Sequence, residues 1–279
     1  MDIDIAALQA IVAPNTQARG ASSLCRPVFW ERALELLIKS SRVVIVTGFY
    51  IRRMQASETD GPPGAVILGR ALASAGRDVL LLTDSRCRVY LEACSRSVGG
   101  PAVICADDAA AVSAPMDLLV FIERPGRAVD GCYYNMKGVD ISDVVAPLDD
   151  LAESASERGI PVLSIGDGGN EAGMGALYDP LKALLPDFSI CISKVPSNVC
   201  LPVDVSNWGG YALAALLSVF YHRWLGLDEN EEDKMLQALL KAGAVDGILG
   251  LANPSVDGIS LPELNEVSLA IKNWYFGSL

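Results

Sequence analysis

Short apolar runs recur along the first two-thirds of the chain, and each is bounded by polar or turn-forming residues. Their length and their content of Val, Ile and Leu are typical of buried strands. The sequence predicts six strands, at residues 42–47, 78–83, 101–105, 118–122, 161–165 and 190–195. Because the runs are continuously apolar instead of alternating, they indicate a parallel sheet covered on both faces.

Segments with the apolar spacing of helices precede, separate and follow these strands. The predicted helices lie at residues 27–40, 64–75, 86–97, 148–158, 175–185, 208–224, 230–242 and 262–274. The alternation predicts an α/β fold, doubly wound, with a mostly parallel sheet, helices on both faces and a more helical C-terminal third. No low-complexity linker or long repeat interrupts the pattern, so residues 1–279 are expected to form a single domain.

Carboxylates follow three of the predicted strands. Asp84 comes after the second strand, Glu123 after the fourth and Asp167 after the fifth. Open α/β sheets bind ligands beyond the carboxyl ends of their strands, so these side chains are expected to share one edge. A single polar residue at a strand end is ordinary loop chemistry, but three together favour a site.

Residues 165–175 form a glycine-rich segment directly behind the fifth strand. Gly168 and Gly173 have the spacing of a phosphate-binding loop, but Met174 replaces the Lys that such a loop requires. Glu171 occupies the place of the third glycine of a dinucleotide fingerprint. The segment therefore predicts no nucleotide cofactor. It presents carboxylates and the amide of Asn170, which suit a cation better than a phosphate.

Two further segments carry charged residues with open interpretations. Glu58 and Asp60 lie on a turn stiffened by two prolines, where they are either oxygen ligands or residues that favour the following helix N-terminus. Glu123 is followed by Arg124 and Arg127. The arginines could bind a substrate carboxylate or phosphate through bidentate hydrogen bonds, or belong to a surface ion-pair cluster.

Two polar residues of the last third are further candidates, Asn207 as a substrate contact and Asp246 as a metal ligand. Asn207 precedes a strongly apolar helix and is either an N-cap or a substrate contact, beside a Gly-Gly pair that permits close backbone approach. Asp246 lies in an Asp-Gly pair, which is either turn chemistry or a metal ligand.

The composition excludes several classes of function. A formal net charge of -12 argues against nucleic-acid and anionic-membrane partners, which need Lys and Arg. Seven cysteines without a C-x-x-C pair, and a single histidine, disfavour a zinc site and histidine catalysis. The N-terminal residues show no secretory signal, so a cytoplasmic location is expected. The oligomeric state is left open, a homo-oligomer included.

A pocket built from so many carboxylates would repel itself unless a cation neutralised it. The predicted metal ligands are Glu58, Asp60, Glu123, Asp167, Glu171 and Asp246. Oxygen ligands without His or Cys favour Mg²⁺, Mn²⁺ or Ca²⁺ over zinc, and this number of carboxylates suits more than one ion.

Four groups of motifs carry a family resemblance that none of them carries alone. They are 47–49 (TGF) with 58–65 (ETDGPPGA); 122–127 (IERPGR) with 133–136 (YYNM), Gly138 and 140–142 (DIS); 166–171 (GDGGNE) with 173–175 (GMG); and 206–211 (SNWGGY). Together they resemble the D-glutamate cyclase family over roughly residues 43–258. The resemblance implies a lyase that converts D-glutamate to 5-oxo-D-proline with loss of water.

The resemblance assigns roles to the candidate residues as hypotheses. A divalent ion, Mn²⁺ or Mg²⁺, held by the acidic ligands would polarise the γ-carboxylate of a small anionic substrate. Glu171 or Asp130 would take protons from the α-ammonium group, and Arg124 or Arg127 would hold the α-carboxylate. The remaining assigned residues are Asn170, expected to face the reacting groups, and Asn135 and Asn207, expected to bind substrate.

Two other functions are compatible with the same residues. Carboxylates that hold a metal beside arginines are also the equipment of a Mn²⁺- or Mg²⁺-dependent phosphatase, in which the metal activates water. A regulator that binds a metal or an amino acid without turnover is the third reading. The fold class alone does not choose among them.

Overall fold

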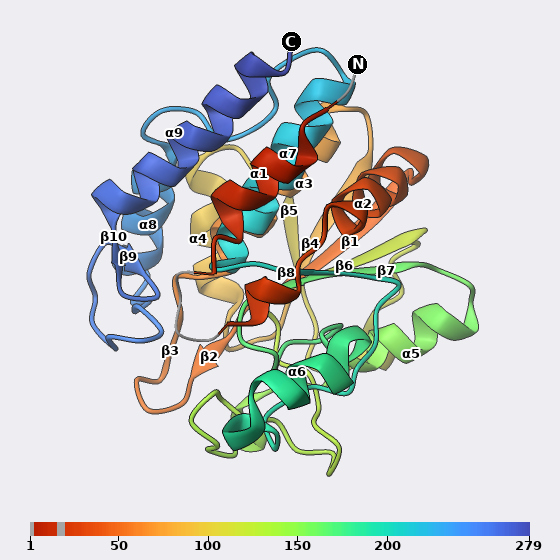
Figure 1. Cartoon of the computed structure of the whole chain (residues 1–279). Helices are drawn as coiled ribbons and strands as arrows, with labels where there is room; N and C mark the ends of the chain where they lie inside the picture. Colours follow the sequence, from red (N-terminus) through yellow and green to blue (C-terminus); the bar gives the residue numbers. More distant parts are fainter. Residues whose placement is uncertain (1–2, 16–19) are drawn as a thin grey trace.

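The computed structural model describes residues 3–15 and 20–279, and its centre is a parallel sheet (Figure 1). The strands of this sheet are β1 (Arg42–Thr47), β4 (Asp78–Thr83), β5 (Ala102–Cys105), β6 (Leu118–Ile122), β7 (Val162–Gly166) and β8 (Val199–Pro202). Their order in the sheet is β5-β4-β1-β6-β7-β8, and every neighbouring pair is parallel. The predicted doubly wound α/β fold is confirmed.

Helices and short turns make up most of the remaining described chain. The α-helices are α1 (Ile5–Val12), α2 (Pro27–Lys39), α3 (Pro62–Ser74), α4 (Arg88–Ser97), α5 (Asp150–Glu157), α6 (Tyr178–Leu184), α7 (Ser206–Phe220), α8 (Glu231–Lys241) and α9 (Leu261–Gly277). The 3-10 turns are η1 (Ala21–Leu24), η2 (Ala109–Ala111), η3 (Ser142–Val144), η4 (Gly175–Leu177) and η5 (Pro186–Phe188). Two antiparallel hairpins pair β2 (Tyr50–Ile51) with β3 (Ala56–Ser57), and β9 (Ser255–Val256) with β10 (Ile259–Ser260).

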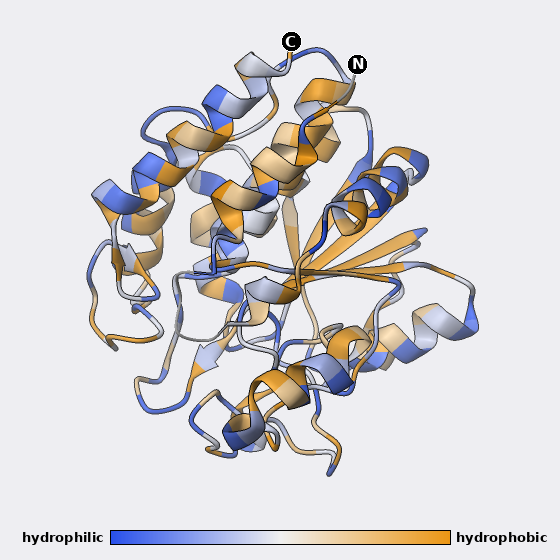
Figure 2. Cartoon of the chain, in the orientation of Figure 1, coloured by the Kyte–Doolittle hydropathy of each residue, from blue (hydrophilic) through white to orange (hydrophobic). Residues whose placement is uncertain are grey.

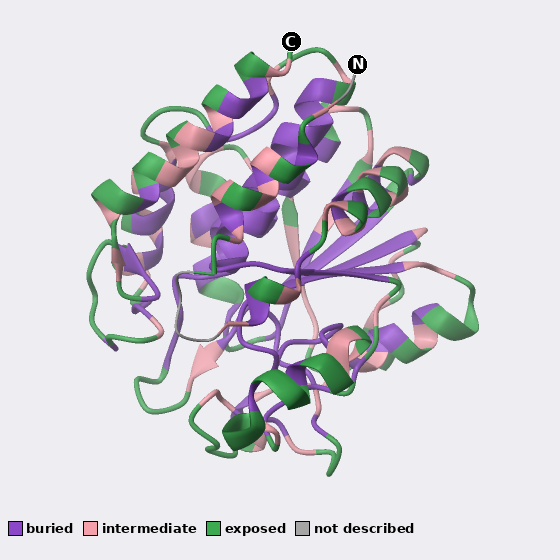
Figure 3. Cartoon of the chain, in the orientation of Figure 1, coloured by how far each residue is buried: buried purple, intermediate pink, exposed green. Residues whose placement is uncertain are grey.

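Alternate residues of β1 point into two different hydrophobic cores. Val43 and Ile45 belong to the larger core, with α3 and α7, whereas Val44 and Val46 belong to the core with α5. The strands are largely hydrophobic in Figure 2, and those inside the sheet are largely buried in Figure 3, whereas the edge strand β5 is partly exposed. Burial on both faces is the reason that the sequence pattern of these strands is continuous instead of alternating.

One predicted strand is wrong. Residues 190–195 lie in turns and loop, and the sixth strand is β8, which begins four residues after this run ends. Ile192 is fully buried with Met174 and Leu181, and Cys191 is fully buried with Ala128 and Tyr134, so the run is apolar because it packs into two small side cores. An apolar run of this length reports burial, and periodicity alone does not separate a strand from a buried loop.

The strand order places a ligand site at one position of the sheet. From β1 the chain winds outward to β4 and β5 on one side, and from β6 it winds outward to β7 and β8 on the other. The carboxyl ends of β1 and β6 therefore lie side by side where the winding direction reverses, the place at which doubly wound folds bind ligands. Glu123 follows β6 directly at this point.

Helices α3 and α7 approach each other closely through two glycines. A Cβ atom on Gly210 would lie 2.4 Å from the carbonyl oxygen of Gly64, and a Cβ on Gly64 would lie 2.8 Å from the Cα of Asn207. The Gly-Gly pair of α7 is thus a helix-packing device, and it brings the first turns of the two helices together.

A buried carboxyl group of α8 makes folding stability depend on pH. Burial raises the pKa of Glu232 from 4.5 to about 7, although the hydroxyls of Ser268 and Tyr211 donate to its oxygens at 2.6 and 3.4 Å. The folded protein holds this proton more tightly than the unfolded chain. The stabilising contribution of Glu232 is therefore greatest below pH 4.5, falls as the pH rises towards 7 and is lost above it.

Glu232→Gln is expected to remove this dependence, because Gln keeps the shape of the protonated acid. The contribution is at most about 3 kcal/mol, measured as the change in the free energy of unfolding by urea between pH 5 and pH 8. Glu266→Gln, on the exposed side of α9, is the matched control and should keep the wild-type dependence. Identical pH profiles for wild type and Glu232→Gln would contradict the assignment.

Candidate metal centre

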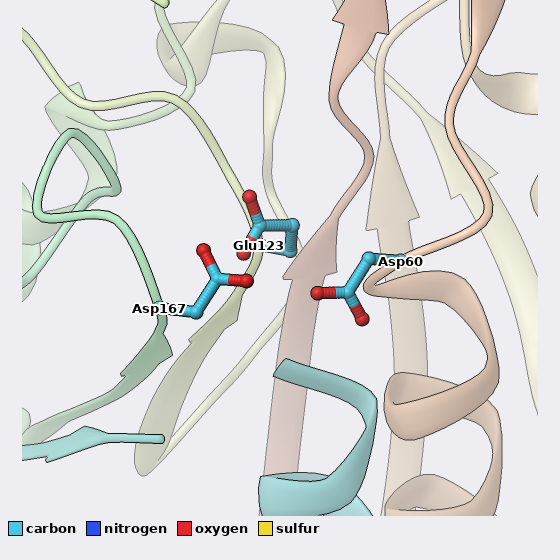
Figure 4. A group of neighbouring side chains, drawn as sticks. All are labelled: Asp60, Glu123 and Asp167. Carbon is cyan, nitrogen blue, oxygen red and sulfur yellow. The ribbon is translucent and has the colours of Figure 1, made fainter. Parts of the chain in front are cut away.

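Three buried carboxylates from distant parts of the chain meet at the carboxyl edge of the sheet. Asp60, Glu123 and Asp167 each offer one oxygen, and these oxygens lie within 4.8 Å of one another. Figure 4 shows the three side chains turned towards a common point. One cation with ligand distances of about 2.0–2.6 Å could bridge such oxygens.

Asp60 connects the N-termini of two helices. It lies between β3 and α3, and its carboxylate accepts hydrogen bonds from the backbone N–H groups of Ser206 and Asn207, each at 2.9 Å. It therefore caps α7 from another part of the chain. Burial, and next the charge of Asp257, raise the pKa of Asp60 to about 7 even though these N–H groups favour its ionised form.

Glu123 has a backbone conformation that few residues adopt. Its φ of 46° is left-handed, which is unusual for a residue other than glycine and is found more often at functional sites. The hydroxyl of Ser206 donates to its Oε2 at 2.6 Å. Burial, followed by the charges of Glu171, Glu58 and Asp60, holds the pKa of Glu123 well above its usual range.

The glycine-rich loop after β7 wraps around a carboxylate of its own. The N–H groups of Asp167 and Gly168 donate to Oε1 of Glu171 at 3.1 and 2.7 Å, and the N–H of Gly169 donates to Oε2 at 2.7 Å. The loop is therefore an anion-binding nest that is filled by Glu171. Its closure around Glu171 holds Asp167 in the acidic cluster and leaves Asn170 beside the cavity.

The acidic cluster fits a hard divalent cation. Its donors are all carboxylate oxygens, which suit Mg²⁺, Mn²⁺ or Ca²⁺ and disfavour soft metals. The raised pKa values of Asp60 and Glu123 show that burying these charges together is unfavourable, and a bound cation would offset that cost.

A cavity of about 890 Å³ reaches the cluster at Glu123. Glu58, Glu123 and Asn170 are buried side chains of its wall, and its exposed wall is basic. The exposed basic residues are Arg52, Arg53, Arg86 and Lys137. The cavity thus joins a buried acidic end to a basic mouth.

Two predicted acidic residues do not join this site. Both carboxylate oxygens of Asp246 are engaged in a turn, by the N–H groups of residues 248, 249 and 258 and by the hydroxyl of Ser255. Asp130 is exposed, accepts a hydrogen bond from the hydroxyl of Tyr134 at 2.6 Å and borders a separate small hollow. The structure therefore places Asp246 in a turn and Asp130 outside the cavity wall, and their roles as ligand and proton acceptor stay predictions.

The two predicted arginines bind other parts of the protein. Arg124 is fully buried and pairs with Asp84 at 2.6 Å, while its second nitrogen donates to the carbonyl oxygen of residue 146. Arg127 pairs with Asp149 and Asp150. Arg124 thus holds the loops after β1, β4 and β6 together, and neither arginine lines the cavity.

The predicted asparagines have different positions. Oδ1 of Asn207 accepts hydrogen bonds from the N–H groups of Gly61 and Gly64, each at 2.9 Å, so Asn207 caps α3. The two helices are thus capped reciprocally, since Asp60 caps α7. This buried role leaves Asn207 outside the cavity wall. Asn135 lines the cavity, although its Oδ1 also accepts from the N–H groups of residues 137 and 139.

Sequence reasoning missed Ser206 and the basic mouth. Nothing local in the sequence shows that the hydroxyl of Ser206 meets Glu123, 83 positions away. The pair Arg52-Arg53 shortly after β1 was a usable signal, since adjacent arginines at a strand exit are unusual in a chain of net charge -12.

Residues 8–271 match the family model described as "D-glutamate cyclase-like, C-terminal". The chain belongs to this family. It is also 30% identical, over an alignment of 300 positions, to the human protein named "D-glutamate cyclase, mitochondrial". The alignment covers 90% of this chain and 48% of the human protein, so the chain spans about half the length of that relative.

Membership of the cyclase-like family confirms the resemblance that the motifs carry. The matched region contains all three residues of the acidic cluster and the whole cavity wall. In the part of the chain that the structure describes, no helix combines the length and the hydropathy needed to cross a membrane.

Proposed function

We propose that this chain is a lyase that converts D-glutamate to 5-oxo-D-proline and water, with a divalent cation, Mn²⁺ or Mg²⁺, at the acidic cluster. The observation that carries the proposal is the meeting of Asp60, Glu123 and Asp167 in a buried cluster whose Glu123 also lines a cavity, in a chain of the cyclase-like family. The human relative is a D-glutamate cyclase by name, and that activity comes to this chain as a proposal.

The cluster supplies the electrophilic half of the reaction. Asp60, Glu123 and Asp167 would hold the cation, which when bound polarises a carboxyl oxygen of the substrate. Ser206 and the first turn of α7 fix the orientations of Glu123 and Asp60 through hydrogen bonds of 2.6 to 2.9 Å. The ligands are therefore positioned before any substrate arrives, which lowers the cost of reorganisation.

The cavity wall supplies the proton acceptor and the orientation of the substrate. The carboxylate of Glu58 lines the cavity, which makes it a better placed acceptor of the ammonium protons than Asp130 or the nest-bound Glu171. The side chain of Asn170 donates to the carbonyl oxygen of Tyr134 at 2.8 Å, which fixes its orientation beside the cavity. A held substrate has its amine and γ-carboxyl group close together, which removes an entropic barrier to ring closure.

Removal of divalent cations is expected to abolish turnover. Purified protein treated with EDTA should lose D-glutamate cyclisation, and Mn²⁺ or Mg²⁺ should restore it, because the polarising cation lowers the barrier by several kcal/mol. Product is followed by mass spectrometry, with L-glutamate as a parallel substrate. Calorimetry should detect binding of the cation in the absence of substrate. Protein that binds no divalent cation, or that cyclises D-glutamate equally well in EDTA, would contradict the proposal.

Neither the family match nor the human relative supports the phosphatase alternative. A panel of phosphate esters in the same assay would reveal it. The cytoplasmic location stays a prediction, and the human relative is mitochondrial by name.

A further inference from the structure

The mouth of the cavity is basic, and its cations differ in how they are held. Arg52 pairs with Asp143 at 3.0 Å. Arg86 lies 5.5 Å from the ring centre of Tyr50 and donates to the carbonyl oxygen of Asp143. Within residues 3–15 and 20–279, the charged groups of Arg53 and Lys137 have no ion-pair partner. In this mouth two basic side chains are therefore held by other residues, and two, those of Arg53 and Lys137, can bind an anionic ligand.

This concentration of positive charge runs against the composition of the chain. The protein has 22 basic and 34 acidic residues, yet the exposed wall of the cavity carries four basic residues beside the single carboxylate of Asp143. Charges of one sign that line a concave wall raise the local concentration of ligands of the opposite sign. The mouth is thus suited to an anionic group, while the buried end is suited to a cation.

The cavity is also large for free glutamate. A volume of about 890 Å³ lies in the upper part of the range that encloses drug-sized ligands, roughly 300–1,000 Å³. Glutamate is a much smaller molecule, and once its γ-carboxyl group and amine are engaged at the buried end, only one carboxylate is left for four basic side chains.

The chemistry of ring closure limits where a longer substrate can be extended. The α-amine must be free, since it is the nucleophile, and the γ-carboxyl group must be intact, since it is the electrophile. Only the α-carboxyl group can carry an extension, and an amide bond there makes glutamate the first residue of a peptide. The carboxylate at the far end of such a peptide would point towards the mouth.

We propose, on the basis of the function proposed above, that the cavity takes short peptides with an N-terminal D-glutamate and a free C-terminal carboxylate, which Arg53 and Lys137 bind. In the reaction the α-nitrogen loses two protons and bonds to the carbon of the γ-carboxyl group. One carboxylate oxygen leaves with those two protons as water, and the product is a 5-oxo-D-prolyl peptide. No oxidant, reductant or co-reactant is needed.

The test compares three substrates on the cation-loaded protein: D-glutamate, D-glutamyl-glycine and D-glutamyl-glycinamide. The dipeptide is expected to have a kcat/KM about tenfold above that of D-glutamate, the gain typical of one added charge-assisted contact. The amide, which lacks the terminal carboxylate, should lose that gain. Arg53→Gln and Lys137→Gln should each raise the KM for the dipeptide severalfold, with a smaller effect on D-glutamate.

Arg32→Gln, an exposed change in α2 outside the cavity, is the matched control and should leave both substrates unaffected. Both mouth variants change exposed side chains, and their melting temperatures verify the fold. Turnover of D-glutamate without a gain for the dipeptide, or equal losses with both substrates in the mouth variants, overturns the peptide proposal and leaves the cyclase intact. Absence of turnover with every substrate overturns both.

Discussion

Glu123→Gln is expected to abolish cation binding and cyclisation while making the cation-free protein more stable. Outer-sphere partners alone change metal affinity by about 10–100-fold, so loss of a direct ligand should exceed about 100-fold. Gln has the shape of the protonated acid and keeps an acceptor for the hydroxyl of Ser206. Because burial and neighbouring charges raise the pKa of Glu123, replacing it with an uncharged Gln should stabilise the cation-free fold.

Thermal unfolding separates these two effects. In EDTA the melting temperature of Glu123→Gln should exceed that of the wild type, and on addition of Mn²⁺ only the wild type should gain stability. Glu153→Gln, an exposed carboxylate of α5, is the control and should follow the wild type in both conditions. If Glu123→Gln binds Mn²⁺ as tightly as the wild type, the cluster is not the metal centre.

Gly210→Ala is expected to be the most damaging single-methyl change in the packing of α3 against α7. The added Cβ would lie 2.4 Å from the carbonyl oxygen of Gly64, and that backbone atom belongs to a helix that cannot shift alone. Overpacking of this kind costs about 1–3 kcal/mol and at times more. Since Asp60 and Asn207 cap the two helices reciprocally, their separation should also disturb the acidic cluster.

The free energy of unfolding in urea measures the first effect, and calorimetric Mn²⁺ affinity measures the second. Gly277→Ala near the end of α9 is the matched control, because a Cβ there meets nothing within 4 Å and its stability should be unchanged. A Gly210→Ala protein with wild-type stability and Mn²⁺ affinity would show that the two helices have room to separate.

The sequence by itself determined the elements of the fold and the family. Strands β1, β4 and β6 have the bounds that their apolar runs predict, because a strand buried on both faces must be apolar throughout. Their alternation with helices determined the doubly wound class. Joint motifs determined the family, and the strand exits were enough to select Glu123 and Asp167 as members of one site.

Which polar groups meet was decided only by the tertiary structure. Asp60 and Asp246 each stand directly before a glycine and look alike in the sequence, yet Asp60 reaches the cluster and Asp246 closes a turn. The sequence suggests Arg124 as a substrate ligand, but in the structure its guanidinium is buried in an ion pair with Asp84, which lies 40 positions earlier in the chain. Nothing in the sequence marks Ser206, whose hydroxyl donates a hydrogen bond to Glu123 in the structure.

The physical reason is that the two kinds of information have different ranges. The pattern of apolar residues depends on the burial of each local segment, so it predicts helices and strands from the sequence alone. The partner of a buried polar group is a side chain or backbone N–H from another segment, and chain packing alone selects it. The acidic cluster, the filled anion nest and the basic mouth therefore follow from the way in which loops after β1, β6 and β7 are packed together, and from the α3–α7 contact beneath them.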